Sequence, residues 1–163
     1  MGPVYGVCKR DLTRGATVGT EMTAWNLKIG DRILRRELHD RFGGGRQGGI
    51  SPSRKSPNVL IFSDHAVGRE HGYNDRRQGD FLLYVGEGQQ GDQSMKHGNR
   101  AILKHVEDGR SIRMFNGCRG VVAYAGRFEV DHLEPWFTER APSSGGGPER
   151  VVIVFRLRKF VEP

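Results

Sequence analysis

The sequence holds little cysteine and no long apolar run, and each absence excludes a class of protein. Only two cysteines occur among 163 residues, Cys8 and Cys118, and neither has neighbours at metal-ligand spacing. We therefore expect neither a disulfide framework nor a structural zinc site, and a reducing cytoplasm is the natural compartment. No apolar run approaches the roughly 18 residues that a membrane span requires. The first ten residues also lack the apolar core of a signal peptide, so we expect no membrane contact and no secretion.

A complete set of catalytic residues is also missing. His65, Glu70 and His71 fit catalytic zinc spacing poorly, because the two histidines lie six residues apart with a single glutamate between them. Asp131-His132 has no downstream asparagine and histidine at the spacing of a nuclease metal motif. We expect a binding module rather than an enzyme, with no cofactor and no metal.

Glycine and positive charge, by contrast, are abundant. A chain of 163 residues is long enough for one domain with a buried core, and 24 glycines with 36% hydrophobic residues favour a loop-rich, mainly β protein. The net charge of +7 and the pI near 9.8 favour a polyanion as partner.

Hydrophobic periodicity predicts an α+β fold with several strands and two helices. Leu34, Leu38 and Phe42 recur at helical spacing, and three glycines at 43–45 would end that helix. A second helix is expected over residues 94–107. Residues 1–28 lack a clear period, so we interpret them as an irregular N-terminal arm before a domain at 29–163. Apolar runs bounded by turn residues predict strands at Asn58–Ser63, Phe81–Val85, 111–115, 121–124, 127–133 and 151–157, with turns at 116–117, 126 and 142–148.

The segment from residue 72 to residue 99 carries the candidate binding site. Tyr73 and Tyr84 bracket Asp75, and the glycine-rich turn Gly86-Glu87-Gly88 follows the second tyrosine. Two aromatic faces can stack on a planar heterocycle, and a carboxylate between them can accept hydrogen bonds from its amine. The alternative is that the tyrosines are packing residues and the aspartate is a turn former.

Several motifs resemble the SRA (SET- and RING-associated, or YDG) domain. Gly72-Tyr73-Asn74-Asp75, Gly79 and the strand that ends in Tyr84-Val85-Gly86 and Gly88 match its G-Y-x-D and Y-T-G-x-G signature. Further matches, in the same order as in the family, are Arg35-Arg36-Glu37-Leu38 with Gly49-Ile50, Asp92-Gln93, Asn99-Arg100-Ala101, and the tail from Tyr124 through Trp136 to Arg158. The resemblance covers about residues 30 to 160.

The resemblance implies a PUA-like β-barrel with two or so flanking helices that flips a modified base out of double-stranded DNA. The base would be 5-methylcytosine or an oxidised form of it. Tyr73 and Tyr84 would sandwich this base, Asp75 would bind its N4 and N3 edge, and the main chain near Val85 and Gly86 would complete the readout. We expect Asn99 and Arg100, by contrast, to stabilise the fold.

Two loops are expected to contact the duplex. In related domains the loop at 43–49 fills the gap that the extruded base leaves, which makes Gln47, and next Arg46, the candidates for a wedge. The loop at 51–57 carries Arg54 and Lys55, which could contact phosphates. The alternatives are a flexible surface turn for the first loop and a low-complexity linker for the second.

Departures from the family pattern bear on specificity. Val85 stands where the family has threonine, and no long insertion separates Gly88 from Asp92. We therefore expect weak sequence context and no preference for hemimethylated sites.

Bacterial domains of this type are often fused to an HNH nuclease. The resemblance thus implies the specificity module of a type IV modification-dependent restriction endonuclease, nucleoid-associated, with a fused or partner nuclease. A reader of phosphorothioate DNA or of RNA on the same barrel, and a nuclease in its own right, remain alternatives.

Overall fold

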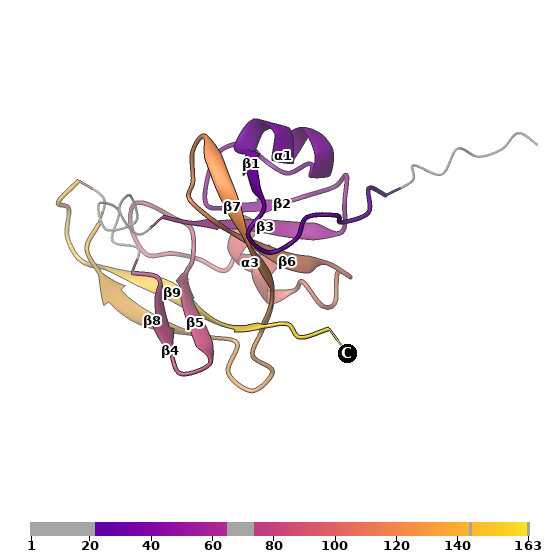
Figure 1. The fold of residues 1–163 in the computed structure, drawn as a ribbon. Helices are drawn as coiled ribbons and strands as arrows, with labels where there is room; N and C mark the ends of the chain where they lie inside the picture. The colour runs from indigo at the N-terminus through magenta and orange to yellow at the C-terminus, as the bar shows by residue number, and fades with distance from the viewer. Residues whose placement is uncertain (1–21, 65–73, 144, 163) are drawn as a thin grey trace, which may run out of the picture.

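The computed structural model describes residues 22–64, 74–143 and 145–162. Within these residues, nine strands form one sheet in the order β2-β3-β6-β7-β9-β5-β4, with β1 paired to β7 and β8 paired to β9 (Figure 1). Two helices flank it. The elements are β1 (Arg32–Leu34), α1 (Arg35–Phe42), β2 (Ile50–Pro52), β3 (Asn58–Ser63), β4 (Arg76–Gln78), β5 (Phe81–Val85), α3 (His97–Leu103), β6 (Ser111–Asn116), β7 (Val121–Val130), β8 (Trp136–Ala141) and β9 (Arg150–Lys159). The prediction of a mainly β fold with two flanking helices is confirmed.

The strand pairings explain the burial pattern. β3 is buried along its whole length, because it lies between antiparallel β2 and parallel β6. β7 instead alternates, with every second residue from Val122 to Val130 buried, as expected for a strand with one face on the core. The main core cluster lies between these strands and α3, and includes Tyr84.

The first predicted helix is confirmed as α1. Leu38 and Phe42 are fully buried, so the helical stripe faces the core. The helix ends at Gly43, whose φ of 80° suits glycine, and the Gly43 N–H donates to the His39 carbonyl at 2.8 Å. In Figure 1, α1 lies beside β1 at one end of the molecule, and the β4–β5 hairpin lies at the other.

Three parts of the predicted secondary structure need correction. The predicted turn at Gly126 is wrong: β7 runs through this residue, which pairs with Met114 of β6, and the register of the two strands shifts by one residue beside it. The φ of Gly126 is 126°. The second helix is shorter than predicted, because after Leu103 the chain continues in turns up to Gly109. The strand β8 was not predicted. It pairs with β9 at the edge of the sheet and is largely exposed, so its sequence has no apolar run that would mark a strand.

The described part of the predicted arm lies on the core. The Trp25 ring centroid is 4.4 Å from that of Phe42 and 5.0 Å from that of Tyr124. The guanidinium carbon of Arg113 lies 4.6 Å from the Trp25 ring centroid. Residues 22–28 therefore contribute an aromatic contact to the fold.

In the described part of the chain, no helix has both the length and the apolar character needed to cross a bilayer.

A buried histidine makes the fold sensitive to acid. His105 is 3% exposed, its Nδ1–H donates to the Arg110 carbonyl at 3.0 Å, and its Nε2 accepts from the Val130 N–H at 3.3 Å. Only the neutral ring can make both bonds, and burial lowers the pKa of His105 below its ordinary value. The unfolded chain therefore binds a proton more readily, so stability falls as the pH drops below about 6.5.

We predict that the melting temperature falls between pH 7.5 and pH 5.5, and that His105→Gln makes this fall smaller. The substitution should also lower the melting temperature at pH 7.5, because two buried hydrogen bonds are disturbed. Thermal unfolding followed by circular dichroism at both pH values measures this. A fall of the same size in the variant would contradict the assignment.

Candidate functional site

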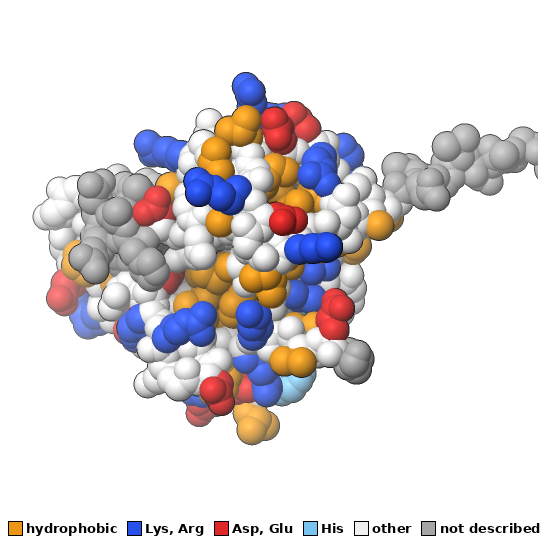
Figure 2. Space-filling view, in the orientation of Figure 1, with side chains coloured by type: hydrophobic (Ala, Val, Ile, Leu, Met, Phe, Trp, Pro, Cys, Tyr) orange, Lys and Arg blue, Asp and Glu red, His pale blue; other side chains and the backbone are white. Residues whose placement is uncertain are grey.

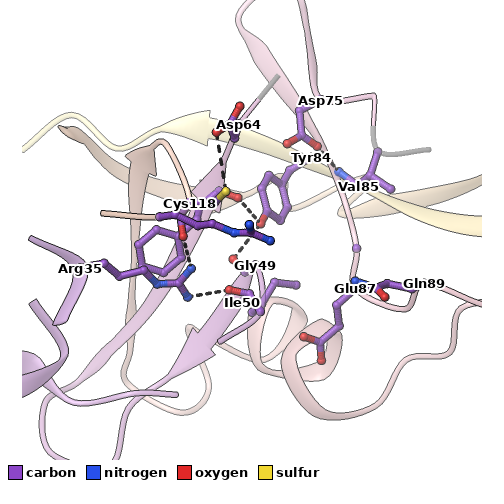
Figure 3. A pocket seen from close by; sticks show the side chains of 14 residues that line it. Arg35, Gly49, Ile50, Asp64, Asp75, Tyr84, Val85, Glu87, Gln89 and Cys118 are labelled. Carbon is purple, nitrogen blue, oxygen red and sulfur yellow. Dashed lines mark hydrogen bonds between the residues drawn. The ribbon is translucent and has the colours of Figure 1, made fainter. Parts of the chain in front are cut away.

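A cavity of about 200 Å³ lies where the ends of β3 and β5 meet the loops around them (Figure 3). It is smaller than the roughly 300–1,000 Å³ of pockets that hold drug-sized ligands, so its size suits a small planar group. Its lining residues come from six segments of the chain. They are Arg35, Gly48, Gly49, Ile50, Phe62, Asp64, Asp75, Tyr84, Val85, Gly86, Glu87, Gln89, Cys118 and Arg119.

Tyr84 lies on β5 and contributes its ring to the cavity. The side chain is 3% exposed, and its hydroxyl oxygen lies 3.0 Å from the carbonyl oxygens of both Gly49 and Phe62, so its one proton is shared between these two acceptors. These contacts tie β5 to β3 and to the glycine-rich loop. They hold the ring in one orientation at the cavity wall.

Asp75 lies at the cavity wall beside the end of β5. Its Oδ1 accepts from the Val85 N–H at 2.8 Å, and its Oδ2 accepts from the Ser63 hydroxyl at 2.7 Å. The carboxylate therefore bridges the ends of β5 and β3, and these bonds fix its direction. Figure 3 places Asp75 beside Tyr84 and Val85, so the structure brings four sequence-predicted residues, Asp75, Tyr84, Val85 and Gly86, to one cavity.

The main-chain donors of the strand end bind within the protein. The Val85 N–H donates to Asp75, and the Gly86 N–H donates to the Ile153 carbonyl at 2.7 Å. If Val85 and Gly86 bind a ligand, they therefore do so through atoms other than these two N–H groups.

Gln93 and Asn99 hold the turn that follows β5. Gln93 donates from Nε2 to the Gly86 carbonyl at 2.7 Å and accepts at Oε1 from the Ile153 N–H at 2.9 Å. Asn99 accepts from the Glu87 N–H at 2.8 Å and donates to the Ser94 carbonyl at 2.9 Å. The predicted structural role of Asn99 is confirmed.

The opposite part of the lining contains a buried arginine that the sequence did not single out. The Arg35 guanidinium donates to the Gly48 carbonyl at 2.6 Å, the Cys118 carbonyl at 2.7 Å and His39 Nε2 at 3.1 Å. Its carbon lies 3.8 Å from the centroid of the Phe62 ring. Burial lowers the pKa of Arg35. Its position as the first residue of the R-x-E-L motif was the only signal in the sequence.

Cys118 also lines the cavity and was not predicted there. Its thiol lies 3.6 Å from Asp64 Oδ2. Burial, and then the charge of Asp64, raise the pKa of Cys118, so the thiol stays protonated at neutral pH. A nucleophilic role is therefore not supported.

The residues predicted to form the wedge and the phosphate contacts lie on the surface. Gln47, Arg46, Arg54 and Lys55 are all exposed, and Gln47 directly precedes two cavity-lining glycines. Arg46 forms an ion pair with Asp40, and Lys55 donates to the Asp40 carbonyl.

The linker interpretation of residues 51–57 is wrong. Ser53 and Ser56 are buried, and both hydroxyls donate to the Phe42 carbonyl at 2.6 Å. This segment therefore caps the carbonyl end of α1, and it holds Arg54 and Lys55 on an ordered piece of chain.

Tyr73 falls outside the described residues, as do His65, Glu70 and His71. Among the residues that are described, no group of three or more histidine, cysteine or acidic side chains could hold a metal ion.

A second hollow of about 470 Å³ shares Gly48, Gly49, Glu87 and Gln89 with the cavity. Its other lining residues are mostly polar, among them Gln90, Lys96 and His97. Lysine and arginine side chains are spread over the face of the molecule seen in Figure 2, with apolar patches between them. The cavity thus borders a hollow with a mostly polar lining, on a protein with a net charge of +7.

A family model described as "ScoMcrA-like, SRA domain" matches residues 29–163. No curated protein sequence matches the chain. Among solved structures, the sulfur binding domain and SRA domain of ScoMcrA complexed with phosphorothioated DNA has a TM-score of 0.64 and 20% identity, over 85% of this chain and 41% of that one. The type IV phosphorothioation-dependent restriction endonuclease ScoMcrA has a TM-score of 0.64 and 21% identity, over 85% and 25%. The SUVH5 SRA complex with hemi methylated CG DNA has a TM-score of 0.60 and 26% identity, over 86% and 94%.

The turn after β5 leaves no room for a side chain at Gly86. A Cβ there would lie 2.6 Å from Asn99 Oδ1 and 3.1 Å from Gln93 Oε1. We predict that Gly86→Ala destabilises the protein by about 1–3 kcal/mol, because those two amides must move and lose their bonds. The matched control is Gly45→Ala, whose Cβ would meet only the Gln47 carbonyl at 3.8 Å. Urea unfolding of both variants measures the difference, and equal stabilities would contradict the prediction.

Proposed function

Because the chain belongs to the ScoMcrA-like SRA domain family, we propose that it binds double-stranded DNA in which a cytosine is modified, and that the modified base leaves the duplex and enters the cavity. The family match over 29–163 identifies a DNA-binding domain. The observation that supports the finer proposal is that the Tyr84 ring and the Asp75 carboxylate line one cavity of about 200 Å³. The SUVH5 SRA domain, which is 26% identical, has been solved with hemi methylated CG DNA.

The contacts available in the cavity match the edges of a cytosine. Its ring would stack on Tyr84, and Tyr73 is the proposed partner on the other face. Its N4 amine would donate to Asp75, which the Val85 N–H and the Ser63 hydroxyl already hold in place. Extrusion costs a few kcal/mol, which stacking and phosphate contacts offset.

The discrimination between cytosine and 5-methylcytosine should be modest. A buried methyl group contributes about 0.8 kcal/mol, which corresponds to a roughly fourfold change in affinity. The larger part of the affinity would come from contacts that both bases make.

The glycine-rich loop at 43–49 and the segment at 51–57 supply the proposed contacts with the duplex. Gln47 directly precedes Gly48 and Gly49 at the cavity wall, so a base entering the cavity would leave its gap in the duplex close to this side chain. Arg54 and Lys55 would contact phosphates, and we propose the same for Arg46, the second candidate for the wedge, with Gln47 as the wedge itself. Asp40 pairs with Arg46, so part of the positive charge of this loop is neutralised in the free protein.

The proposal also concerns the role of this chain within a larger restriction enzyme. The chain spans 25% of the length of the ScoMcrA endonuclease that it matches. We propose that it is the specificity module of a modification-dependent restriction endonuclease, with the nuclease on a fused or partner domain. A cleavage assay on this chain alone should give no product, whereas a metal-dependent cut would assign it a nuclease activity.

Phosphorothioate DNA is the second candidate ligand, because the ScoMcrA structure contains phosphorothioated DNA. That chain also holds a sulfur binding domain, and this chain matches 41% of its length. A competition assay separates the candidates: a methylcytosine duplex displaces a labelled methylcytosine duplex under our proposal. Displacement by an unmethylated phosphorothioate duplex or by structured RNA at equal concentration would favour the second candidate.

We predict that Asp75→Ala abolishes the preference for the modified base. The affinity for a duplex with one 5-methylcytosine should fall about ten- to hundredfold, because the base loses its hydrogen bond to a charged acceptor and no longer stays in the cavity where its methyl group would be buried. Fluorescence titration with duplexes carrying cytosine, 5-methylcytosine or 5-hydroxymethylcytosine at one position measures this. Asp80→Ala is the control, since Asp80 is an exposed residue of the β4–β5 turn. Equal binding of all three duplexes by the unaltered protein would refute the proposal.

Arg46→Ala should weaken binding to modified and unmodified duplexes by the same factor. The slope of log affinity against log salt concentration should fall by about one unit, because one phosphate contact is lost. Arg140→Ala is the control, since Arg140 forms a similarly exposed ion pair with Glu149 on the β8–β9 hairpin. A change in base preference in Arg46→Ala, or an equal effect of Arg140→Ala, would count against this role.

A further inference from the structure

We infer that Arg35 is a positioning residue for the cavity: it joins the glycine-rich loop to the β6–β7 turn, and His39 holds it in the orientation that does so. We call its hydrogen bonds to the Gly48 and Cys118 carbonyls the Arg35 bridge. The effect of this bridge on base discrimination rests on the function proposed above. The bridge itself is a property of the free protein.

The two carbonyls belong to different cavity walls. Gly48 lies in the loop that follows α1, and Cys118 lies in the turn between β6 and β7. The 2.6 Å and 2.7 Å bonds from one guanidinium fix the separation of these segments, because the donors of arginine form a rigid planar fork. The next residue, Gly49, accepts from the Tyr84 hydroxyl, so the same loop holds the stacking ring. Figure 3 shows Arg35 and Cys118 on one side of this ring and Asp75 on the other.

The surroundings of Arg35 contain no described acidic partner. Its contacts within the described residues are two carbonyls, the His39 imidazole and the face of Phe62. Burying a cation among dipoles alone is costly. Here the cation gives hydrogen bonds to the Gly48 and Cys118 carbonyls, which would lose this donor in a variant without the guanidinium, so the two segments should loosen there.

His39 supports the bridge in one protonation state only. Its Nε2 accepts from Arg35 Nε at 3.1 Å, so the proton sits on Nδ1, which donates to the Gly43 carbonyl at 2.8 Å. A proton on Nε2 would set an N–H against the guanidinium N–H. The charged groups around the imidazole are Arg35, Arg46 and Asp40.

Acid should therefore weaken the bridge. Burial lowers the pKa of His39, as do the two arginines, while the Gly43 carbonyl and Asp40 act in the opposite direction. With a pKa below the ordinary value of about 6.5, His39 is neutral at pH 7.5 and becomes protonated as the pH falls through the lowered value. Base discrimination should fall over the same range.

The first experiment needs no DNA. Hydrogen exchange followed by mass spectrometry on Arg35→Met and Arg35→Lys should show faster exchange in both segments, 43–49 and 117–120. Arg36→Met is the matched control, since Arg36 is the next residue of α1, is exposed, and loses the same charge. Arg35→Lys keeps the charge but lacks the fork, and it provides a second variant if Arg35→Met unfolds. Unchanged exchange in both segments would overturn the bridge, whatever the DNA titrations give.

The second experiment measures the ratio of the dissociation constants for unmodified and 5-methylcytosine duplexes. In both Arg35 variants this ratio should fall towards one, and in the Arg36→Met control it should keep the value of the unaltered protein. In the unaltered protein the ratio should fall as the pH drops through the lowered pKa of His39, and in His39→Gln it should stay constant. An unaltered protein that binds both duplexes equally would refute the proposed function, and the exchange result would still decide the bridge. Normal discrimination in the Arg35 variants, or a normal pH profile in His39→Gln, would overturn the positioning role.

Discussion

Hydrogen bonds from side chains of neighbouring elements hold the backbone of the loops around the cavity, in addition to the bonds that these loops make to strands. Buried backbone groups need partners, and here several of them come from distant parts of the chain. Arg35 binds the Cys118 carbonyl, 83 residues away, and Arg150 binds the carbonyls of Gly88 and Gly91. Each loop that borders the cavity thus depends on polar contacts whose geometry is sensitive to small changes.

Under the proposed function, these side-chain hydrogen bonds would keep the cavity formed before DNA binds. Extrusion of a base costs a few kcal/mol, and a cavity that had to order itself at the same time would add a further entropic cost. The Tyr84 hydroxyl and the Asp75 carboxylate are both held by hydrogen bonds within the protein, so the Tyr84 ring and the carboxylate already point in fixed directions before any ligand binds. In contrast to Tyr84 and Asp75, Gln47 and Arg46 are exposed side chains, on the glycine-rich loop that continues into the cavity-lining Gly48 and Gly49.

The sequence predicted those parts of the fold that depend on local patterns. β3, β5 and α1 were found because a short apolar run and a helical stripe depend on nearby residues only. β8 and the path of β7 through Gly126 were not, because they depend on pairing with distant strands. In the same way, a motif located Asp75 and Tyr84, whereas Arg35 and Cys118 reach the cavity through contacts that no local pattern contains.

The two sides of the cavity come from separate parts of the chain, and this bears on how one fold can serve different marks. Asp75, Val85 and Gly86 belong to the segment around β5, where the strand pairing with β9 fixes the backbone. Cys118 and Arg119 belong to a turn between β6 and β7, where substitutions disturb no strand pairing. The two sides can therefore change independently. With identities of 20–26% to its solved relatives, this chain keeps their fold. Asp75 and Tyr84 stand at positions that match the SRA signature, whereas Cys118 and Arg119 lie outside the matching motifs, so the turn between β6 and β7 is the side at which domains of this fold are expected to differ.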